Sequence, residues 1–349
     1  MEQRRSGRQK CSKGGEKLIR ISQLKLPITH TKAQLEKKIA KTLKNPGNSF
    51  TYEIKKQSLD CRHKNDKIFV YTVDVTIRDE QKLVKKVNNN NIMLTKEKPY
   101  EFPSPGETPL LHSPVIVGSG PAGLFCGWYL AKAGYCPIIL ERGEEAEKRQ
   151  KTVENFWKNG VLDPESNVQF GEGGAGTFSD GKLNTLVKDP YGRNHEVLKR
   201  FVAAGAPEEI IYQQKPHLGT DVLVGIVEKM RHEIEEMGGK FCFRSKVTDL
   251  IFENNTLKEI EINNDKRIPA QVCVLAPGHS ARDTFEMLQK RGVYMEPKSF
   301  AVGLRIEHPQ EMINMDLYGE PENELLGAAS YKVTHKCANG RGVYSFCMC

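Results

Sequence analysis

A glycine-rich turn between an apolar strand and a helix constrains the fold of this chain more than any other feature. Residues 115–117 read as a short buried strand, and Gly118-Ser119-Gly120-Pro121-Ala122-Gly123 follows at once. In a G-x-G-x-x-G turn the first glycine permits the tight turn, the second lets a pyrophosphate approach the backbone, and the third lets helix and strand pack closely. A helix over 121–133 and a strand over 137–141 complete the predicted βαβ unit.

An acidic residue stands where such a turn needs one. Glu141 ends the second strand, 23 residues after Gly118, and its carboxylate can accept hydrogen bonds from a ribose diol. The free amides and the dipole at the start of the helix favour phosphate oxygens. The sequence therefore predicts a dinucleotide site, and the alternative is a glycine-rich turn that binds nothing.

The first hundred residues predict a separate small α+β unit. They hold 24 Lys and Arg against 10 Asp and Glu, whereas the remainder holds 28 against 34. Thr31 and Gln34 form a capping-box pattern that starts a helix, and residues 67–77 alternate apolar and polar as a strand does. The other elements predicted here are strands over 18–24 and 50–59 and a helix over 80–87. Five prolines between Lys98 and Pro114 exclude a helix or central strand, so we place a boundary near residue 105.

The remainder alternates helical and strand patterns. We predict helices over 144–159, 195–204 and 220–237 and from near Ser280, and short strands over 240–244, 246–253, 257–263 and 267–275. The run Gly171-Glu172-Gly173-Gly174-Ala175-Gly176 also fits G-x-G-x-x-G, but the residues before it are polar. It is therefore not a second Rossmann turn. Two interpretations of its glycines remain: they let a flat ligand approach the backbone closely, or they form a flexible surface loop.

Composition excludes several classes of protein. The longest apolar stretch, 110–140, is interrupted by glycines and prolines, so we predict no membrane span. Nine cysteines without a signal peptide favour a reducing, cytoplasmic location. Cys337, Cys347 and Cys349 with His335 do not have zinc-site spacing, and we predict no metal. The scattered lysines of the basic front favour a solvated surface over a nucleic-acid interface.

The motifs together resemble a bacterial family of FAD-dependent oxidoreductases whose FAD-binding fold is of the glutathione-reductase type. Segments throughout the chain carry this resemblance: 58–62, 69–71, 115–123, 140–143, 170–183, 216–221, 276–282 and 300–309. The implied fold class is α/β: a Rossmann-like FAD/NAD(P)-binding domain with a parallel sheet plus an antiparallel β-meander, preceded by a small α+β (ferredoxin-like) N-terminal domain. The implied organisation is a flexible basic tail (1–17), the N-terminal domain (18–97), a Pro-rich linker (98–113), the FAD-binding domain (114–297) and the start of an incomplete C-terminal domain (298–349).

The resemblance also implies roles for individual residues. The turn would hold the FAD pyrophosphate, Glu141 the adenosine ribose, and Val247 the adenine through its backbone. The loop from Gly173 to Lys182 would pass along the flavin and pyrophosphate. The full set of cofactor-binding residues expected is Gly118, Ser119, Gly120, Pro121, Ala122, Gly123, Glu141, Arg142, Gly143, Gly173, Gly174, Ala175, Gly176, Thr177, Ser179, Asp180, Lys182, Val247, Ala276 and Gly278.

Two departures from the family pattern stand out. Pro277 follows Ala276 where related flavoproteins more often have threonine, and proline removes a backbone donor. Folds of this type also close with a Gly-Asp segment that contacts the ribityl-phosphate region, and this chain contains no Gly-Asp dipeptide. We therefore expect a truncated version of a longer pattern.

The function expected is that of an FAD-dependent oxidoreductase, a dehydrogenase or reductase acting on a small molecule, with NAD(P)H as a transient reductant. No catalytic acid or base is assigned; Asp180, Lys182, His279 and Arg282 are candidates by position alone. The alternatives are a non-catalytic nucleotide-binding fragment and, less favoured, an RNA-modifying flavoprotein.

Overall fold

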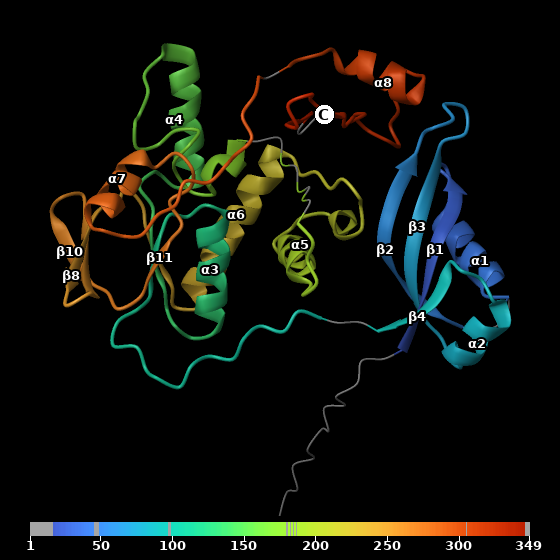
Figure 1. Cartoon of the computed structure of the whole chain (residues 1–349), viewed down its shortest axis with the longest axis horizontal. Helices are drawn as coiled ribbons and strands as arrows, with labels where there is room; N and C mark the ends of the chain where they lie inside the picture. Colours follow the sequence, from blue (N-terminus) through green and yellow to red (C-terminus); the bar gives the residue numbers. More distant parts are fainter. Residues whose placement is uncertain are drawn as a thin grey trace, which may run out of the picture.

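The computed structural model describes residues 17–44, 49–96, 99–178, 181, 183, 185, 187–304 and 306–345. Its N-terminal unit, drawn in blue and cyan in Figure 1, has two helices on a four-stranded antiparallel sheet of order β2-β3-β1-β4. The six elements run in the order β1 (Lys17–Pro27), α1 (Lys32–Thr42), β2 (Thr51–Asp60), β3 (Ile68–Thr76), α2 (Glu80–Val87) and β4 (Ile92–Lys96). This β-α-β-β-α-β order is the ferredoxin-like topology that the sequence predicts.

Local sequence explains most of this unit. The capping box of Thr31 and Gln34 is present, and Leu35 and Ile39 are the buried face of α1. They pack on the inward residues of β1 and β3, of which Ile19, Ile21, Val73 and Val75 have no exposed surface. β4 was not predicted, because it is short and follows a run of asparagines.

The Rossmann turn lies in a second, parallel sheet of order β11-β5-β6-β7. The sheet pairs β5 (Val115–Val117) with β6 (Ile138–Leu140) on one side and with β11 (Cys273–Leu275) on the other, and β6 also pairs with β7 (Lys240–Cys242). Two helices, α3 (Pro121–Lys132) and α6 (Thr220–Glu236), pack together beside it. Leu124, Trp128 and Met230 share their core with Ile116 of β5, which places the turn on a rigid edge.

A three-stranded antiparallel sheet lies beside the parallel one. It contains β8 (Val247–Glu253), β9 (Thr256–Ile262) and β10 (Lys266–Pro269), with β9 in the middle. The expected meander over all the strands after residue 240 was too broad, since β7 joins the parallel sheet. The single strand expected over 267–275 is two strands, and its second half, β11, also joins the parallel sheet. Periodicity could not separate them because each half is only three or four residues long.

The remaining elements surround these sheets. They are α4 (Ala146–Asn159), the 3₁₀ turns η1 (Gly174–Phe178) and η2 (Glu208–Ile211), α5 (Arg193–Ala203), α7 (Arg282–Lys290), α8 (Gln310–Tyr318), and the hairpin of β12 (Thr334–Lys336) and β13 (Gly342–Tyr344). Residues 99–114 contain neither helix nor strand, as their prolines predict. The domain boundary near residue 105 stays a prediction. No helix among the described residues is long and apolar enough to cross a membrane.

We expect the core beneath the turn to tolerate little loss of volume. Ile116 has no exposed surface, so Ile116→Ala should lower the free energy of unfolding by about 2–5 kcal/mol and Ile116→Val by about 0.5–1.5 kcal/mol. Urea unfolding followed by tryptophan fluorescence, to which Trp128 in this core contributes, measures both. Equal midpoints for the two variants and the parent would contradict this packing.

Candidate functional site

The predicted turn has a backbone that only glycine allows at two positions. Gly118 has a φ of +99°, and a Cβ added there would collide with the carbonyl oxygen of Ala276. A Cβ on Gly123 would collide with the carbonyl oxygen of Gly118. The first glycine therefore permits contact with the segment after β11, and the third permits contact between helix and strand, as a Rossmann turn requires.

The start of α3 presents backbone donors that the chain does not use. Among the described residues, the amides of Gly120, Ala122 and Gly123 have no hydrogen-bond acceptor. Pro121 occupies the first turn and lacks an amide hydrogen. Pro121 and Ala122 are exposed, so the described residues leave this corner open to solvent. Unpaired amides at the positive end of a helix dipole form a site for an anion.

Glu141 is buried and receives four hydrogen bonds from the chain. One carboxylate oxygen accepts from the amide of Ser119 at 2.9 Å and from its hydroxyl at 2.7 Å. The other accepts from the amides of Gly143 at 2.9 Å and Gly171 at 3.0 Å. A carboxylate offers about four acceptor positions, so this one is satisfied internally. Glu141 joins the turn, the end of β6 and the segment that begins with the second glycine run. We call this segment, residues 171–183, the glycine-rich loop.

The second glycine run folds directly onto the first. Gly173 donates its amide to the carbonyl of Ser119 at 3.0 Å. A Cβ on Gly174, where φ is +63°, would lie 3.1 Å from the Cα of Gly120. The alternative of a flexible surface loop is wrong for residues 171–178. These residues pack against the turn, and 174–178 form η1.

A buried arginine that the sequence interpretation missed holds this loop. Arg149, on α4, has no exposed surface and donates to the backbone carbonyls of Asn167, Val168, Glu172 and Gly174 at 2.7–3.1 Å. Burial lowers the pKa of its guanidinium to about 10, so it stays charged at neutral pH. The helical pattern of α4 predicted a polar surface, and only the arginine's place on the inner face, in line with Ala146 and Val153, signalled burial.

Glu172 is the buried counter-charge of this loop. One of its oxygens accepts from the amide of Ala146 at 2.8 Å and the other from Arg231 of α6 at 2.7 Å. Burial raises the pKa of Glu172 above its ordinary value, and the ion pair with Arg231 opposes that rise. The glycine loop is therefore fastened to α4 and α6 by charged side chains rather than by an apolar core.

Arg142 is engaged by the chain and does not reach out as a free cation. It donates to Glu165 at 2.7 Å and to both oxygens of Asp283 at 2.9 Å, and its guanidinium lies over the ring of Phe170. Lys246 bonds the same two carboxylates. Burial tends to raise the pKa of Asp283, but the hydrogen bonds from Arg142 and Lys246 outweigh it and hold that pKa below the ordinary value.

Several of the other predicted cofactor residues lie near the ends of β5 and β6. The amide of Ala276 donates to the carbonyl of Val117 at 2.9 Å, and Gly278, at a φ of +78°, faces open space. Residues 244–247 run past the end of β6, because the amides of Ser245 and Arg244 donate to the carbonyls of Glu141 and Gly143. Ala175 is exposed, whereas Thr177 is buried. Ser179, Asp180 and Lys182 lie outside the described residues, as do Cys347 and Cys349.

Of the remaining candidates, His279 is exposed and contacts Phe300 edge-on, and Arg282 begins α7. Burial raises the pKa of the thiols of Cys126 and Cys273, which disfavours the thiolate form that a nucleophile needs. Within the described part of the chain, no three His, Cys, Asp or Glu side chains gather as metal ligands would.

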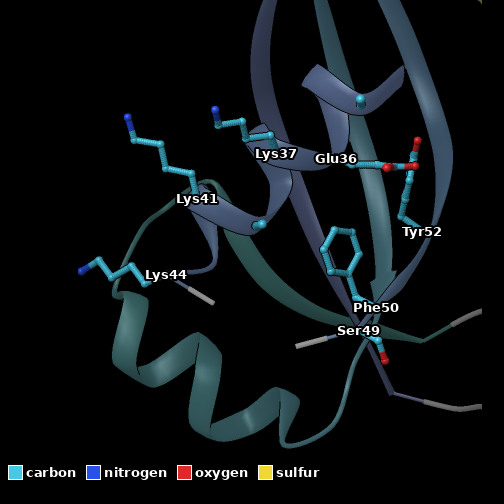
Figure 2. Close-up of a pocket in the computed structure, with 9 residues that line it drawn as sticks. Glu36, Lys37, Lys41, Lys44, Ser49, Phe50 and Tyr52 are labelled. Carbon is cyan, nitrogen blue, oxygen red and sulfur yellow. The ribbon is translucent and has the colours of Figure 1, made fainter. Parts of the chain in front are cut away.

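A wide open hollow of about 900 Å³ lies elsewhere, on the N-terminal unit. Figure 2 shows Lys37, Lys41 and Lys44 of this hollow extending away from Phe50. Its lining residues are Ala33, Glu36, Lys37, Ala40, Lys41, Lys44, Ser49, Phe50 and Tyr52. It contains none of the predicted cofactor residues, and its polar groups do not converge on a point, so we place the candidate site at the turn.

Comparison with known families agrees with the geometry. Residues 116–150 match the family model of the NAD(P)-binding Rossmann-like domain, and residues 299–349 match "FAD-dependent protein, C-terminal domain-like". The family signals are those of FAD-dependent proteins. This confirms the resemblance and the fold class predicted from the sequence. Residues 18–76 match a domain of unknown function.

Known relatives and structures are similar over parts of the chain. An uncharacterised protein of Clostridium beijerinckii is 45% identical over 334 residues, which span 95% of this chain but only 62% of that protein. Thermovibrio ammonificans THI4 is 21% identical with a TM-score of 0.35, covering 52% of this chain and 63% of its own. Lactococcus lactis thioredoxin reductase is 18% identical with a TM-score of 0.26, covering 48% and 35%. Similarity at these scores carries no information about substrate.

Removing the buried guanidinium should loosen the glycine-rich loop. Arg149→Met leaves the four backbone carbonyls that the guanidinium bonds without a donor, and we expect a loss of about 3–5 kcal/mol of folding free energy with faster proteolysis near residues 165–178. Lys148→Met on the exposed side of α4 is the matched control, with a change within about 0.5 kcal/mol. Thermal unfolding and timed proteolysis measure both. Similar behaviour of the two variants would contradict the role of Arg149.

Asp283 should contribute to acid sensitivity. Its folded-state pKa is depressed, so the stabilisation it contributes is fully present above its ordinary pKa of 3.8. This stabilisation is lost as the pH falls from that value through the lower folded-state pKa. We expect Asp283→Asn to be less stable than the parent at neutral pH, with the difference narrowing between about pH 5 and pH 2. Urea unfolding across this range measures it. Asp265→Asn, in an exposed turn, is the control, and a parallel offset at every pH would contradict the assignment.

Proposed function

We propose that this chain binds FAD with its pyrophosphate at the start of α3 and acts as an FAD-dependent oxidoreductase on a small molecule. The observation that carries the proposal is the set of unpaired amides of Gly120, Ala122 and Gly123, which lie at an uncovered Rossmann turn. The match of residues 116–150 to a Rossmann-like domain supports a dinucleotide at this turn, and the match of residues 299–349 to FAD-dependent proteins supports FAD as that dinucleotide.

The surrounding residues fit such a ligand. A Cβ on Gly120 would meet only the Cα of Gly174, at 3.8 Å, and Cβ atoms on Gly176 and Gly278 would meet nothing within 4 Å, so the backbone leaves room on several sides. The ribose would bind at Glu141, where a hydroxyl would have to share an oxygen that already accepts from the chain. The adenine would bind against the backbone at Val247.

Each part of the site has its own task. When bound, the flavin supplies the hydride chemistry. The amides at the start of α3 bind and orient the diphosphate, Glu141 fixes the geometry of the turn, and Arg149 holds the loop of residues 173–177 in place. The part of the chain described here has one Rossmann turn, so we propose that NAD(P)H donates its hydride as a visiting reductant rather than from a second nucleotide domain.

A methyl group at the second glycine tests the proposal directly. The φ of Gly120 is −66° and its added Cβ makes only ordinary contact, so Gly120→Ala should fold, yet it puts a methyl where the diphosphate must approach. We expect the dissociation constant for FAD to rise by at least about tenfold. Titration of the flavin-free protein with FAD, followed by flavin fluorescence, measures it.

Gly225→Ala is the matched control, since this helical glycine faces open space and lies on α6. The control should bind FAD as the parent does. Parent protein that takes up no FAD would overturn the proposal and favour the alternative of a fragment without turnover. Tight FAD binding that Gly120→Ala leaves unchanged would place the cofactor elsewhere.

A further inference from the structure

The N-terminal unit makes a backbone contact that reaches toward the proposed cofactor site. β2 is an outer strand of its sheet, and the amide of Gln57 points away from β3. This amide donates to the carbonyl of Tyr212 at 2.7 Å, and the carbonyl of Gln57 accepts from the amide of Gln214 at 3.0 Å. The segment between α5 and α6 thus extends the N-terminal sheet by a short parallel pairing, on the β2 side of α5 in Figure 1.

The same segment is also hydrogen-bonded to the end of the glycine-rich loop. We call residues 212–218 the strap. At its far end, the amide of Leu183 donates to the carbonyl of Pro216 at 3.0 Å, and the amide of Leu218 donates to the carbonyl of Gly181 at 2.9 Å. A Cβ on Gly181, where φ is +63°, would collide with the carbonyl oxygen of Leu218. The approach is therefore close enough to require glycine.

The strap is well placed to transmit position between its two ends. Leu218 is 2% exposed and belongs to the core beside α6, and Pro216 fixes one backbone angle between the ends. Lys215 adds a third attachment, because its ammonium donates to the hydroxyl of Ser330 at 2.8 Å. The strap is therefore hydrogen-bonded at both of its ends and at Lys215 between them.

We propose that the N-terminal unit is an intramolecular clamp: through Gln57 it holds the strap, and through the strap it positions the 181–183 end of the glycine-rich loop. The unit matches a domain of unknown function, and this gives it a role within its own chain. The effect on FAD rests on the proposed function, because the resemblance sets this loop beside the flavin. The effect on backbone order does not depend on FAD.

A proline at position 57 removes the outward amide selectively. Edge strands tolerate proline where the amide points away from the sheet, so Gln57→Pro deletes the bond to Tyr212 while sparing the ladder with β3. In the whole chain without flavin, we expect amide hydrogen exchange at Gly181, Leu183 and Leu218 to accelerate roughly two- to tenfold. With flavin, we expect FAD to dissociate faster by a similar factor.

Two controls isolate that amide. Gln57→Ala keeps the amide but removes the side-chain bond to Tyr71, and Leu59→Pro removes an outward amide, two residues further along β2, that has no partner among the described residues. Both should leave exchange at 181–183 at the parent rate. Parent-like exchange in a folded Gln57→Pro variant would overturn the clamp even if FAD binds. Faster exchange in a protein that never binds FAD would support the clamp while the proposed function fails.

Discussion

The carboxylate of Glu141 is the interaction on which the candidate site depends. It is buried at the end of β6 and satisfies donors from three segments that are separate in sequence: Ser119 in the turn, Gly143 after the strand and Gly171 in the glycine-rich loop. An unpaired buried amide costs about 1–3 kcal/mol, so a single side chain removes several such penalties. The turn, the end of β6 and the glycine-rich loop are therefore held together before a cofactor binds.

Local patterns predicted those parts of the molecule in which a short sequence decides its own structure. The capping box of α1, the strand–turn–helix at 115–132 and the glycine at position 123 all follow from backbone sterics and hydrogen bonding within a few residues. Partnering between distant segments was harder to predict. β7 and β11 were taken as parts of a meander because a strand of three residues is too short to show whether its partners are parallel or antiparallel.

In the candidate site too, contacts between distant segments were harder to predict than local patterns. The glycines and Glu141 were predicted because their spacing carries the chemistry. Arg149 was missed as part of the site because a charged residue in a helix normally faces water, and only the folded chain shows that it meets four carbonyls. Asp283 was missed because its partners, Arg142 and Lys246, are distant in sequence. Arg142 was expected among the cofactor-binding residues, and two carboxylates from other segments engage its donors. Charge networks that close between distant segments leave no local signature.

The pairing between β2 and the strap also affects the order of events during synthesis. Gln57 leaves the ribosome long before Tyr212 does, and domains that are made first generally fold first. For that interval the outer strand of the N-terminal sheet exposes hydrogen-bonding groups that a neighbouring nascent chain could pair with. Arg62 and Lys55, both charged and both on or next to this strand, discourage such pairing until the chain's own later segment arrives.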